Sequence, residues 1–486
     1  MNEVETPRPP TPAGSSHDRE VEQALYREVH GLFAGLRVVA VAALLGIFYG
    51  LPWLPWDGRQ AVLFDLPARK FYIFGLTFWP QDFLLLAFLL IIAALSLFFF
   101  TALAGRLWCG YACPQTVWTE VFLWLEHLIE GDRQKQIKLD KSPHSFRKFR
   151  IKATKHAVWI IFSAFTGFTF VAYFTPATEL AGKVASLNLG PWEAFWLIFY
   201  GFATYGNAGW LREQVCLYMC PYARFQSAMF DDDTLVVSYD EKRGEPRGPR
   251  RVETDHRARG LGDCINCTLC VQVCPTGIDI RDGLQYQCIS CSACIDACND
   301  VMDKMSYPRG LIRYTTQNAI QGKKTRVLRP RIIIYGIILL IFTGVFAYLI
   351  ATRIPLQLDV IRDRNQLYQE KQGQIENVYT LKVLNMDDHP HQYHISVNGE
   401  EIEHMRLIAD QNPVAVNAGE VLVVPVRVRA DEEHLEHRIS RIRFIISDVH
   451  NPDLEVSESA RFLGPMPCLN PISQKSADGI SSRTCG

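Results

Sequence analysis

Eight cysteines in the middle of the chain have a spacing that is typical of iron–sulfur proteins. They form two runs of the pattern C-x2-C-x2-C-x3-C, which are Cys264, Cys267, Cys270 and Cys274, then Cys288, Cys291, Cys294 and Cys298. In such runs three closely spaced thiolates hold three irons of one cluster, and the fourth ligates the other cluster. The sequence therefore predicts two [4Fe–4S] clusters of the bacterial ferredoxin type. One set of ligands is Cys264, Cys267, Cys270 and Cys298, and the other is Cys288, Cys291, Cys294 and Cys274.

Structural zinc is the competing interpretation, because paired C-x2-C motifs also bind zinc. Zinc sites seldom repeat the full spacing twice, and a disulfide framework would not persist in a reducing cytoplasm. Pro275 follows Cys274, as the ferredoxin pattern requires, whereas Asn299 follows Cys298. This departure concerns the geometry around Cys298 and leaves the number of thiol ligands unchanged.

Four further cysteines form two matching pairs of the pattern C-x3-C-P. Cys109 and Cys113 lie in RLWCGYACPQTVW, and Cys216 and Cys220 lie in REQVCLYMCPYARF, each pair just after an apolar run. Proline suits the first turn of a helix, so we expect the second cysteine of each pair near a helix N-terminus, where its thiolate would be stabilised. Thiolates suit Cu(I), zinc or a further iron–sulfur centre, and spacing alone does not choose among them. The alternative is that all four are small buried side chains.

Five apolar runs approach the length of about 20 residues that a membrane-spanning helix needs. They are residues 32–51, 83–105, 156–174, 192–211 and 332–351. The fourth run is the weakest, because it is rich in aromatic and small residues and could instead be an interfacial or buried helix. We therefore expect a four-helix membrane part over residues 32–211 and a fifth transmembrane helix at residues 332–351.

Basic residues set the expected orientation in a bacterial inner membrane. Ten Lys and Arg side chains fall in the loop 106–155, whereas Lys183 is the only one between residues 175 and 191. Because cytoplasmic loops are rich in Lys and Arg, the loop 106–155 is expected in the cytoplasm. Five spans then put the cysteine-rich domain, residues 212–331, on the cytoplasmic side and the C-terminal domain in the periplasm.

Residues 374–465 alternate apolar and polar side chains in short runs, separated by turns such as Asn398-Gly399. This pattern predicts a small all-β, Ig-like sandwich. The fold class is thus multi-domain: an α-helical membrane part, an inserted ferredoxin-like α+β domain and a C-terminal sandwich. The histidines His389, His391 and His394 could bind a metal, but a solvated surface is the simpler interpretation.

The two ends of the chain are polar. Residues 1–31, which open with a Pro- and Thr-rich stretch, are expected to be a disordered cytoplasmic tail, and residues 466–486 a flexible tail. In an oxidising compartment Cys468 and Cys485 could pair, although we favour a mobile tail for Cys485. The net charge of −1 gives no support for nucleic-acid binding, and no nucleotide motif suggests a flavin or nicotinamide.

These motifs together resemble one known family. WCGYACPQTVWTE, CLYMCPYARFQSAM, RKFYIFGLTFWPQDF, the doubled ferredoxin block and the strand-rich C-terminus are similar, in order and spacing, to the cytochrome c oxidase accessory proteins called CcoG, FixG or RdxA. The resemblance implies a role in assembling cbb3-type oxidase, in which electrons from the clusters reduce Cu(II) to Cu(I). It makes Cys109, Cys113, Cys216 and Cys220 the candidate copper contacts. It also implies oxidase subunits or copper chaperones as partners, beside the membrane lipid.

Two other functions stay open at this level. The chain could be a quinol-oxidising subunit that feeds electrons to a partner reductase, because quinol-dehydrogenase-like membrane subunits share the C-x3-C-P pairs or the ferredoxin run. It could also be a scaffold whose sandwich docks an oxidase subunit. The electron donor, either another protein or a quinol, and a homodimer are both left open by the sequence.

Overall fold

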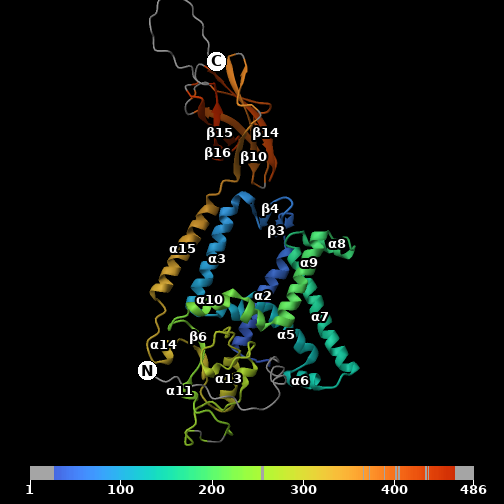
Figure 1. Ribbon diagram of the computed structural model, residues 1–486, viewed down its shortest axis with the longest axis vertical. Helices are drawn as coiled ribbons and strands as arrows, with labels where there is room; N and C mark the ends of the chain where they lie inside the picture. Colours follow the sequence, from blue (N-terminus) through green and yellow to red (C-terminus); the bar gives the residue numbers. More distant parts are fainter. Residues whose placement is uncertain are drawn as a thin grey trace, which may run out of the picture. The chain divides into compact units, whose positions relative to one another are not determined.

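The computed structural model divides the chain into two compact units, Met1–Ala347 and Tyr348–Gly486. The described residues are 27–465, without 253–254, 256, 365, 372, 388, 400–401, 403–404, 433–434 and 436. The two terminal tails expected from the sequence fall largely outside this range, and so do Cys468 and Cys485. Helices and strands carry the labels of Figure 1.

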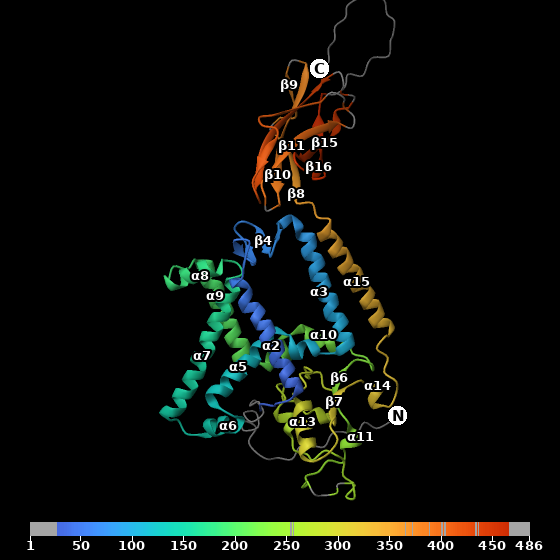
Figure 2. The same ribbon diagram turned by 180° about the vertical axis from the view of Figure 1, so that it is seen from behind.

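Three helices among the described residues are long and apolar enough to cross a membrane. The first is α2 (Leu32–Gly50), which a short turn extends to Trp53. The second is α3 (Phe83–Ala104), and the third is α15 (Pro330–Ala351). α3 and α15 lie side by side in both views (Figures 1 and 2), with the rings of Phe88 and Phe342 5.7 Å apart. These three correspond to the first, second and fifth predicted spans.

The predicted count of five spans is not confirmed. The other two apolar runs fold into α7 (Phe146–Val171) and α9 (Pro191–Thr204), with α8 (Ala177–Ala185) between them. α7 starts in the basic segment, and α9 is short and continues into the π-helical turns η3 (Tyr205–Leu211). The two helices pack so closely that a Cβ atom on Gly167 would lie only 2.4 Å from the Leu197 carbonyl oxygen. They form a helical hairpin beside α2 (Figure 1).

The basic segment 106–155, the predicted cytoplasmic connection between spans, is mainly helical. It contains α4 (Leu107–Tyr111), α5 (Pro114–Glu130) and α6 (Arg133–Lys141) before α7 begins. Some of its cations are paired within the fold: Lys155 Nζ lies 3.0 Å from Glu126 and 2.8 Å from Glu130. The amphipathic α5 packs against α7 through Phe122, which is fully buried. The basic residues elsewhere in the segment obscure the amphipathic pattern of α5 in the sequence.

The connection between α2 and α3 folds into short antiparallel strands. These are β1 (Pro55–Trp56), β2 (Arg59–Gln60), β3 (Val62–Asp65), β4 (Lys70–Ile73) and β5 (Leu76–Phe78). The Phe64 N–H donates to the Tyr173 carbonyl at 2.7 Å, and the Tyr173 hydroxyl donates to the Phe48 carbonyl at 2.8 Å. The ends of α2 and α7 are therefore joined at this small sheet.

The cysteine-rich part is a small α+β fold inserted between α10 (Pro221–Met229) and α15. Its strands β6 (Val236–Tyr239) and β7 (Ile312–Thr315) pair antiparallel and bring its two ends together. The other elements are α11 (Glu241–Gly244), α12 (Leu269–Gln272), a turn at Ile280–Asp282, α13 (Ala293–Lys304) and α14 (Gln317–Ile320). Apolar side chains from both strands and from α13 form a core around the cysteines.

The second unit is a sandwich of two antiparallel sheets, as the alternating pattern predicts. One sheet consists of β12 (Arg406–Ala409), β14 (Val421–Asp431), β10 (Gln374–Asn385) and β8 (Leu356–Arg362), with β9 (Gln369–Lys371) also on β10. The other consists of β13 (Val414–Val416), β11 (His391–Gly399), β15 (Ile439–Asp448) and β16 (Glu455–Leu463). The sandwich starts at Leu356 and not at Gln374, because β8 completes the first sheet. Tyr379 and Phe444 meet in the core between the sheets.

Candidate metal centres

Two neighbouring cavities in the cysteine-rich part are lined by cysteines. The first is lined by Cys264, Cys267, Cys270 and Cys298. The second is lined by Cys274, Cys288, Cys291 and Cys294. The structure thus brings together the two sets that the sequence predicts, including the exchange of Cys274 and Cys298 between the runs. Cys270 lines the second cavity as well, so the two cavities are neighbours.

The backbone turns around the second cysteine of each run are alike. The residues before and after Cys267 and Cys291 have positive φ angles, from 54° to 63°; they are Asn266, Thr268, Ser290 and Ser292. Such conformations cost energy in residues other than glycine and persist only where the surrounding structure holds them. Here the Tyr314 hydroxyl donates to the Ser290 carbonyl at 2.7 Å, and Arg281 donates to Asn266 Oδ1 at 2.7 Å. These turns let the closely spaced thiols of one run face one cavity.

The chemistry of both cavities fits an iron–sulfur cluster. Burial raises the pKa of Cys270 to about 12 and that of Cys291 to about 12, so these thiols need a bound metal to become thiolate ligands. Each cavity is lined by the four cysteines that the sequence assigns to it, and in a [4Fe–4S] cluster each of four thiolates binds its own iron. A bound cluster would supply one-electron redox chemistry.

The two C-x3-C-P pairs stand at the starts of two helices. Cys113 directly precedes α5 and Cys220 directly precedes α10, and both helices begin with proline, which confirms the predicted positions. Burial raises the pKa of Cys113, although the backbone N–H groups of Gln115 and Thr116 at the helix start stabilise its thiolate in the predicted direction. Burial likewise raises the pKa of Cys109 to about 12 and that of Cys216 to about 11.

The fold brings the four thiols Cys109, Cys113, Cys216 and Cys220 into one group, which we call the membrane-edge thiols. Cys113 interacts electrostatically with each of the other three, although the two pairs are far apart in the sequence. Cys109 also donates from Sγ to Gln226 Oε1 of α10 at 3.4 Å. All four are half-buried, so a ligand can reach them.

Arg106 belongs to this site, and nothing in the sequence singles it out from the other basic residues of its segment. Its side chain is only 3% exposed and donates to the Ala223 carbonyl of α10. Burial raises the pKa of Cys109, Cys216 and Cys288, and the charge of Arg106 acts in the opposite direction on all three. One buried cation is therefore close to both the membrane-edge thiols and the second cavity.

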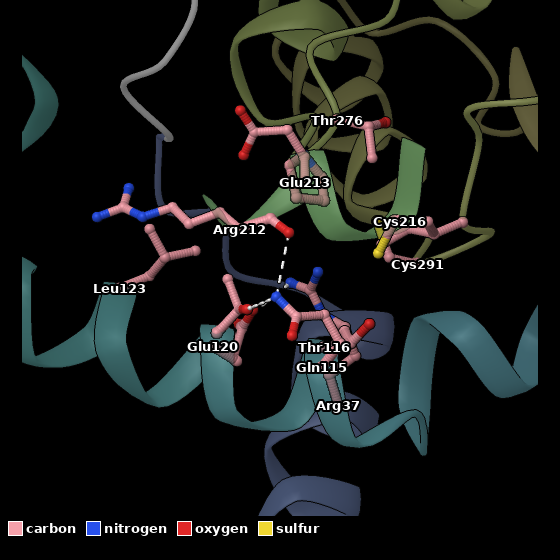
Figure 3. Close-up of a pocket in the computed structure, with 13 residues that line it drawn as sticks. Arg37, Gln115, Thr116, Glu120, Leu123, Arg212, Glu213, Cys216, Thr276 and Cys291 are labelled. Carbon is pink, nitrogen blue, oxygen red and sulfur yellow. Dashed lines mark hydrogen bonds and ion pairs between the residues drawn. The ribbon is translucent and has the colours of Figure 1, made fainter. Parts of the chain in front are cut away.

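The membrane-edge thiols lie against the second cavity. Cys109 packs on the buried cluster of side chains that includes Ile289 and Cys291. A Cβ atom on Gly110 would lie 2.8 Å from the Ile289 carbonyl oxygen and 2.9 Å from the Cys291 nitrogen, so glycine is needed for this approach. Cys216 and Cys291 also line one pocket, which Figure 3 shows. The membrane-edge thiols are thus close to the second cavity.

Asp296 is a second residue of this region that nothing in the sequence singles out. It lies on α13 between Cys294 and Cys298, and its carboxylate accepts from the Ala34 N–H at 2.8 Å and from the Phe33 N–H at 3.4 Å. It therefore satisfies amides of the first turn of α2 that have no partner within the helix. Gly31 makes room for it, since a Cβ atom there would lie 2.3 Å from Asp296 Cγ. One membrane helix is thereby attached to the helix that carries two of the cavity cysteines.

The histidines of the sandwich do not form a metal group within the described part of the chain. His391 is held between two carboxylates, with Nδ1 2.6 Å from Asp448 and Nε2 3.0 Å from Asp387. His389 is 81% exposed. A structural ion pair beside a solvated surface accounts for both positions.

Three protein-family models match parts of the chain. A model described as a 4Fe-4S dicluster domain matches residues 211–317, and one described as a 4Fe-4S binding domain matches residues 86–131. A third, described as an IG-like fold at the C-terminal of FixG, matches residues 346–465. The first match includes both cysteine cavities, which supports iron–sulfur clusters there. The second includes Cys109 and Cys113.

Known proteins are similar over most of their length. Nitrogen fixation protein FixG of Rhizobium meliloti (strain 1021) is 38% identical over 445 residues, which are 83% of this chain and 85% of the relative. Protein RdxA of Cereibacter sphaeroides is 39% identical over 391 residues, 77% of this chain and 81% of the relative. The crystal structure of a FixG-related protein from Vibrio parahaemolyticus covers 22% of this chain and 95% of that chain, with 34% identity and a TM-score of 0.21.

Proposed function

Because the chain belongs to the FixG/RdxA family of iron–sulfur electron-transfer proteins, we propose that it delivers electrons to Cu(II) at the membrane-edge thiols. Each Cu(II) takes one electron and becomes Cu(I), and no covalent bond of the protein changes. The Cu(I) serves the assembly of a cbb3-type oxidase, and oxidase subunits or copper chaperones are the proposed partners. The proposed location is the bacterial inner membrane.

The observation that supports this proposal most is the contact between the membrane-edge thiols and the second cavity. Gly110 brings the backbone of the first C-x3-C-P pair against Cys291, and Cys109 packs on the same cluster of buried side chains. A substrate ion held by these thiols would be next to the ligands of an electron carrier. Arg106 adds a fixed positive charge that favours thiolates over thiols in this group.

The donor atoms favour the reduced ion. Cu(II) prefers nitrogen and oxygen ligands in tetragonal sites, whereas Cu(I) prefers a few soft sulfurs. The thioether of Met219, which is 60% exposed, adds another soft donor between Cys216 and Cys220. A small number of sulfur ligands suits Cu(I) and a site that must release its cargo.

The proposed orientation does not depend on whether α7 and α9 cross the membrane. The first turn of α2 is hydrogen-bonded to Asp296 of the cysteine-rich part. Arg329, just before α15, donates to the Ala102 carbonyl near the end of α3. α7 and α9 form a hairpin, so crossing by both or by neither leaves the direction of α15 unchanged. The basic segment 106–155 then supports clusters in the cytoplasm and the sandwich in the periplasm.

A further [4Fe–4S] cluster at the membrane-edge thiols is the second candidate. It is favoured by the match of residues 86–131, which include Cys109 and Cys113, to a 4Fe-4S binding domain. Four thiols that approach one another without converging on one ion also suit a cluster. In that case the chain would be an electron relay with three clusters, and copper would be reduced elsewhere or not at all.

Copper reduction by chemically reduced protein tests the proposal. The full-length protein is reduced with dithionite, freed of excess reductant and mixed with Cu(II), and Cu(I) is trapped by a colour-forming chelator. The double variant Cys113→Ser, Cys220→Ser should lose most of the Cu(I) formed while both clusters remain. Cys468→Ser, which belongs to neither cysteine group, is the matched control. Equal rates in the double variant and the control would show that the thiols are not the site.

A further inference from the structure

A large groove in the membrane part has no role in the function proposed above. It lies between α2, α5 and α7, has a volume of about 790 Å³, and extends along α2 from Ala34 to Tyr49. At a rise of 1.5 Å per residue this stretch is about 22 Å long, which is most of the hydrocarbon thickness of about 30 Å of a bilayer. Pockets for organic ligands commonly have volumes of about 300–1,000 Å³. The groove is therefore large enough for a ligand with a ring and an apolar tail.

The wall that α2 contributes includes several residues with small side chains. Ala34, Gly35, Ala42 and Gly46 all line the groove. No atom of the described residues lies within 4 Å of the position that a Cβ atom would occupy on Gly35 or Gly46. These glycines therefore do not serve a close contact between helices, although glycine in a helix costs about 1 kcal/mol relative to alanine. The space in front of them is available to a ligand.

Polar groups gather towards one end of the groove. Arg37 of α2 is only 5% exposed, and its guanidinium lies 3.9 Å from the Glu120 carboxylate of α5. At the mouth, His127 Nδ1 lies 3.2 Å from the Glu28 carboxylate. Arg37 and Glu120 also line the pocket of Figure 3 together with Cys291, and Arg37 interacts electrostatically with that cysteine. The Arg37–Glu120 pair thus stands between the groove and the second cysteine cavity.

We propose that this groove binds a membrane quinone, with the ring at Gly35 and the Arg37–Glu120 pair and the isoprenoid tail along α2 towards Tyr49. The guanidinium can donate to a quinone carbonyl, and the carboxylate can accept from a quinol hydroxyl, so the pair suits both forms of the ligand. Oxidation of one quinol to the quinone releases two electrons and two protons. Two clusters that take one electron each balance the electrons, and the protons leave to water at the mouth.

A phospholipid fits the same groove less well. The Glu120 carboxylate beside the Arg37 guanidinium would repel a phosphate group. An uncharged quinone ring does not meet this obstacle.

The test uses the purified full-length protein in detergent and decyl-benzoquinone as the probe. Binding is measured by equilibrium dialysis, and the quinone that copurifies is extracted and counted per chain. Gly35→Phe fills the groove beside Arg37 and should weaken binding at least about tenfold, or about 1.4 kcal/mol. Gly344→Phe on α15 is the control, since no atom of the described residues lies within 4 Å of that Cβ position either. It adds the same ring outside the groove and should leave binding unchanged.

A second variant keeps the test decisive if the added ring disturbs folding. Glu120→Gln leaves the side-chain volume almost unchanged. It should weaken binding of the quinol more than binding of the quinone, because only the quinol donates a hydrogen bond to the carboxylate. Iron content reports whether each variant is folded. Equal affinity in wild type, Gly35→Phe and Glu120→Gln would overturn the proposal, as would displacement of the probe by short-chain phosphatidylglycerol. Copper reduction by dithionite-reduced protein should be the same in Gly35→Phe and wild type, so this site and the copper site can fail separately.

Discussion

The two groups of cysteines in the first unit are positioned in different ways. The eight of the cysteine-rich part lie in two short runs, and positive-φ turns around Cys267 and Cys291 face them into two cavities. The membrane-edge thiols come from two helix starts far apart in the sequence and meet because α10 is held against α3 and α4 by the Thr101–Tyr222 and Cys109–Gln226 hydrogen bonds. The first site follows from the spacing of its cysteines along the chain, whereas the second forms only when distant segments of the chain pack together. The second should therefore be sensitive to residues that are not its ligands.

The largest expected effect is at the site that spacing encodes. Cys291→Ser should remove the second cluster and lower the iron content from about eight to about four atoms per chain, because each cluster holds four. Iron analysis and EPR of the dithionite-reduced protein measure this loss. Cys468→Ser should keep all the iron. A full iron content in Cys291→Ser would contradict the ligand set.

Gly110→Ala tests the contact between the two groups and changes no ligand. The new Cβ atom would press on Ile289 and Cys291, and such overpacking costs about 1–3 kcal/mol. The iron content should stay full, while Cu(II) should reoxidise the reduced clusters more slowly in a stopped-flow measurement of visible absorbance. Gly182→Ala on α8, with no atom of the described residues within 4 Å of its Cβ position, is the control. An unchanged rate in Gly110→Ala would remove this contact from the electron path.

Asp296→Ala tests how the cysteine-rich part is attached to α2. The variant loses a carboxylate that accepts from the Ala34 and Phe33 amides, and loss of such a cap costs about 1 kcal/mol. Hydrogen exchange at the first turn of α2 should speed up accordingly. Asp300→Ala, an exposed position on the same helix, should change little. Exchange at α2 that responds equally to both variants would show that Asp296 does not act as the cap.

The smallest expected effect is in the sandwich, which carries neither group of cysteines. Burial alone would lower the pKa of His391, but hydrogen bonds to Asp387 and Asp448 outweigh it and raise this pKa. The ion pair therefore stabilises the fold fully below the unfolded pKa of about 6.5 and loses this contribution as pH rises through the folded pKa. Hydrogen exchange in β11 and β15, corrected for its intrinsic pH dependence, should increase over that range in wild type. His391→Gln should abolish the increase, and identical profiles would contradict a role for the ion pair.

Local patterns in the sequence were sufficient for part of this structure. The repeated spacing predicts which cysteines share a cavity, and the prolines predict that Cys113 and Cys220 precede helices, because both features depend on neighbouring residues. The alternating pattern likewise predicts the sandwich. Its first strand, β8, was outside the predicted domain because that strand is defined by its pairing with β10.

Features that depend on distant partners could not be predicted in this way. Arg106 looks like any other basic residue until its contact with Ala223 and its position near the thiols are known. Asp296 looks like a surface carboxylate of α13, yet its partners are amides at the other end of the unit's sequence. The apolar run at residues 192–211 is long enough to span a membrane, but the helix α9 ends at Thr204.

Counting iron and copper per chain tests most directly the central claim that the membrane-edge thiols are a copper site separate from the clusters. Wild type and the double variant Cys113→Ser, Cys220→Ser are loaded with Cu(I) without oxygen, and both metals are measured. We expect about eight iron atoms in each protein and bound copper in wild type alone. About twelve iron atoms in wild type and about eight in the double variant would contradict the claim, because the thiols would then hold a further cluster.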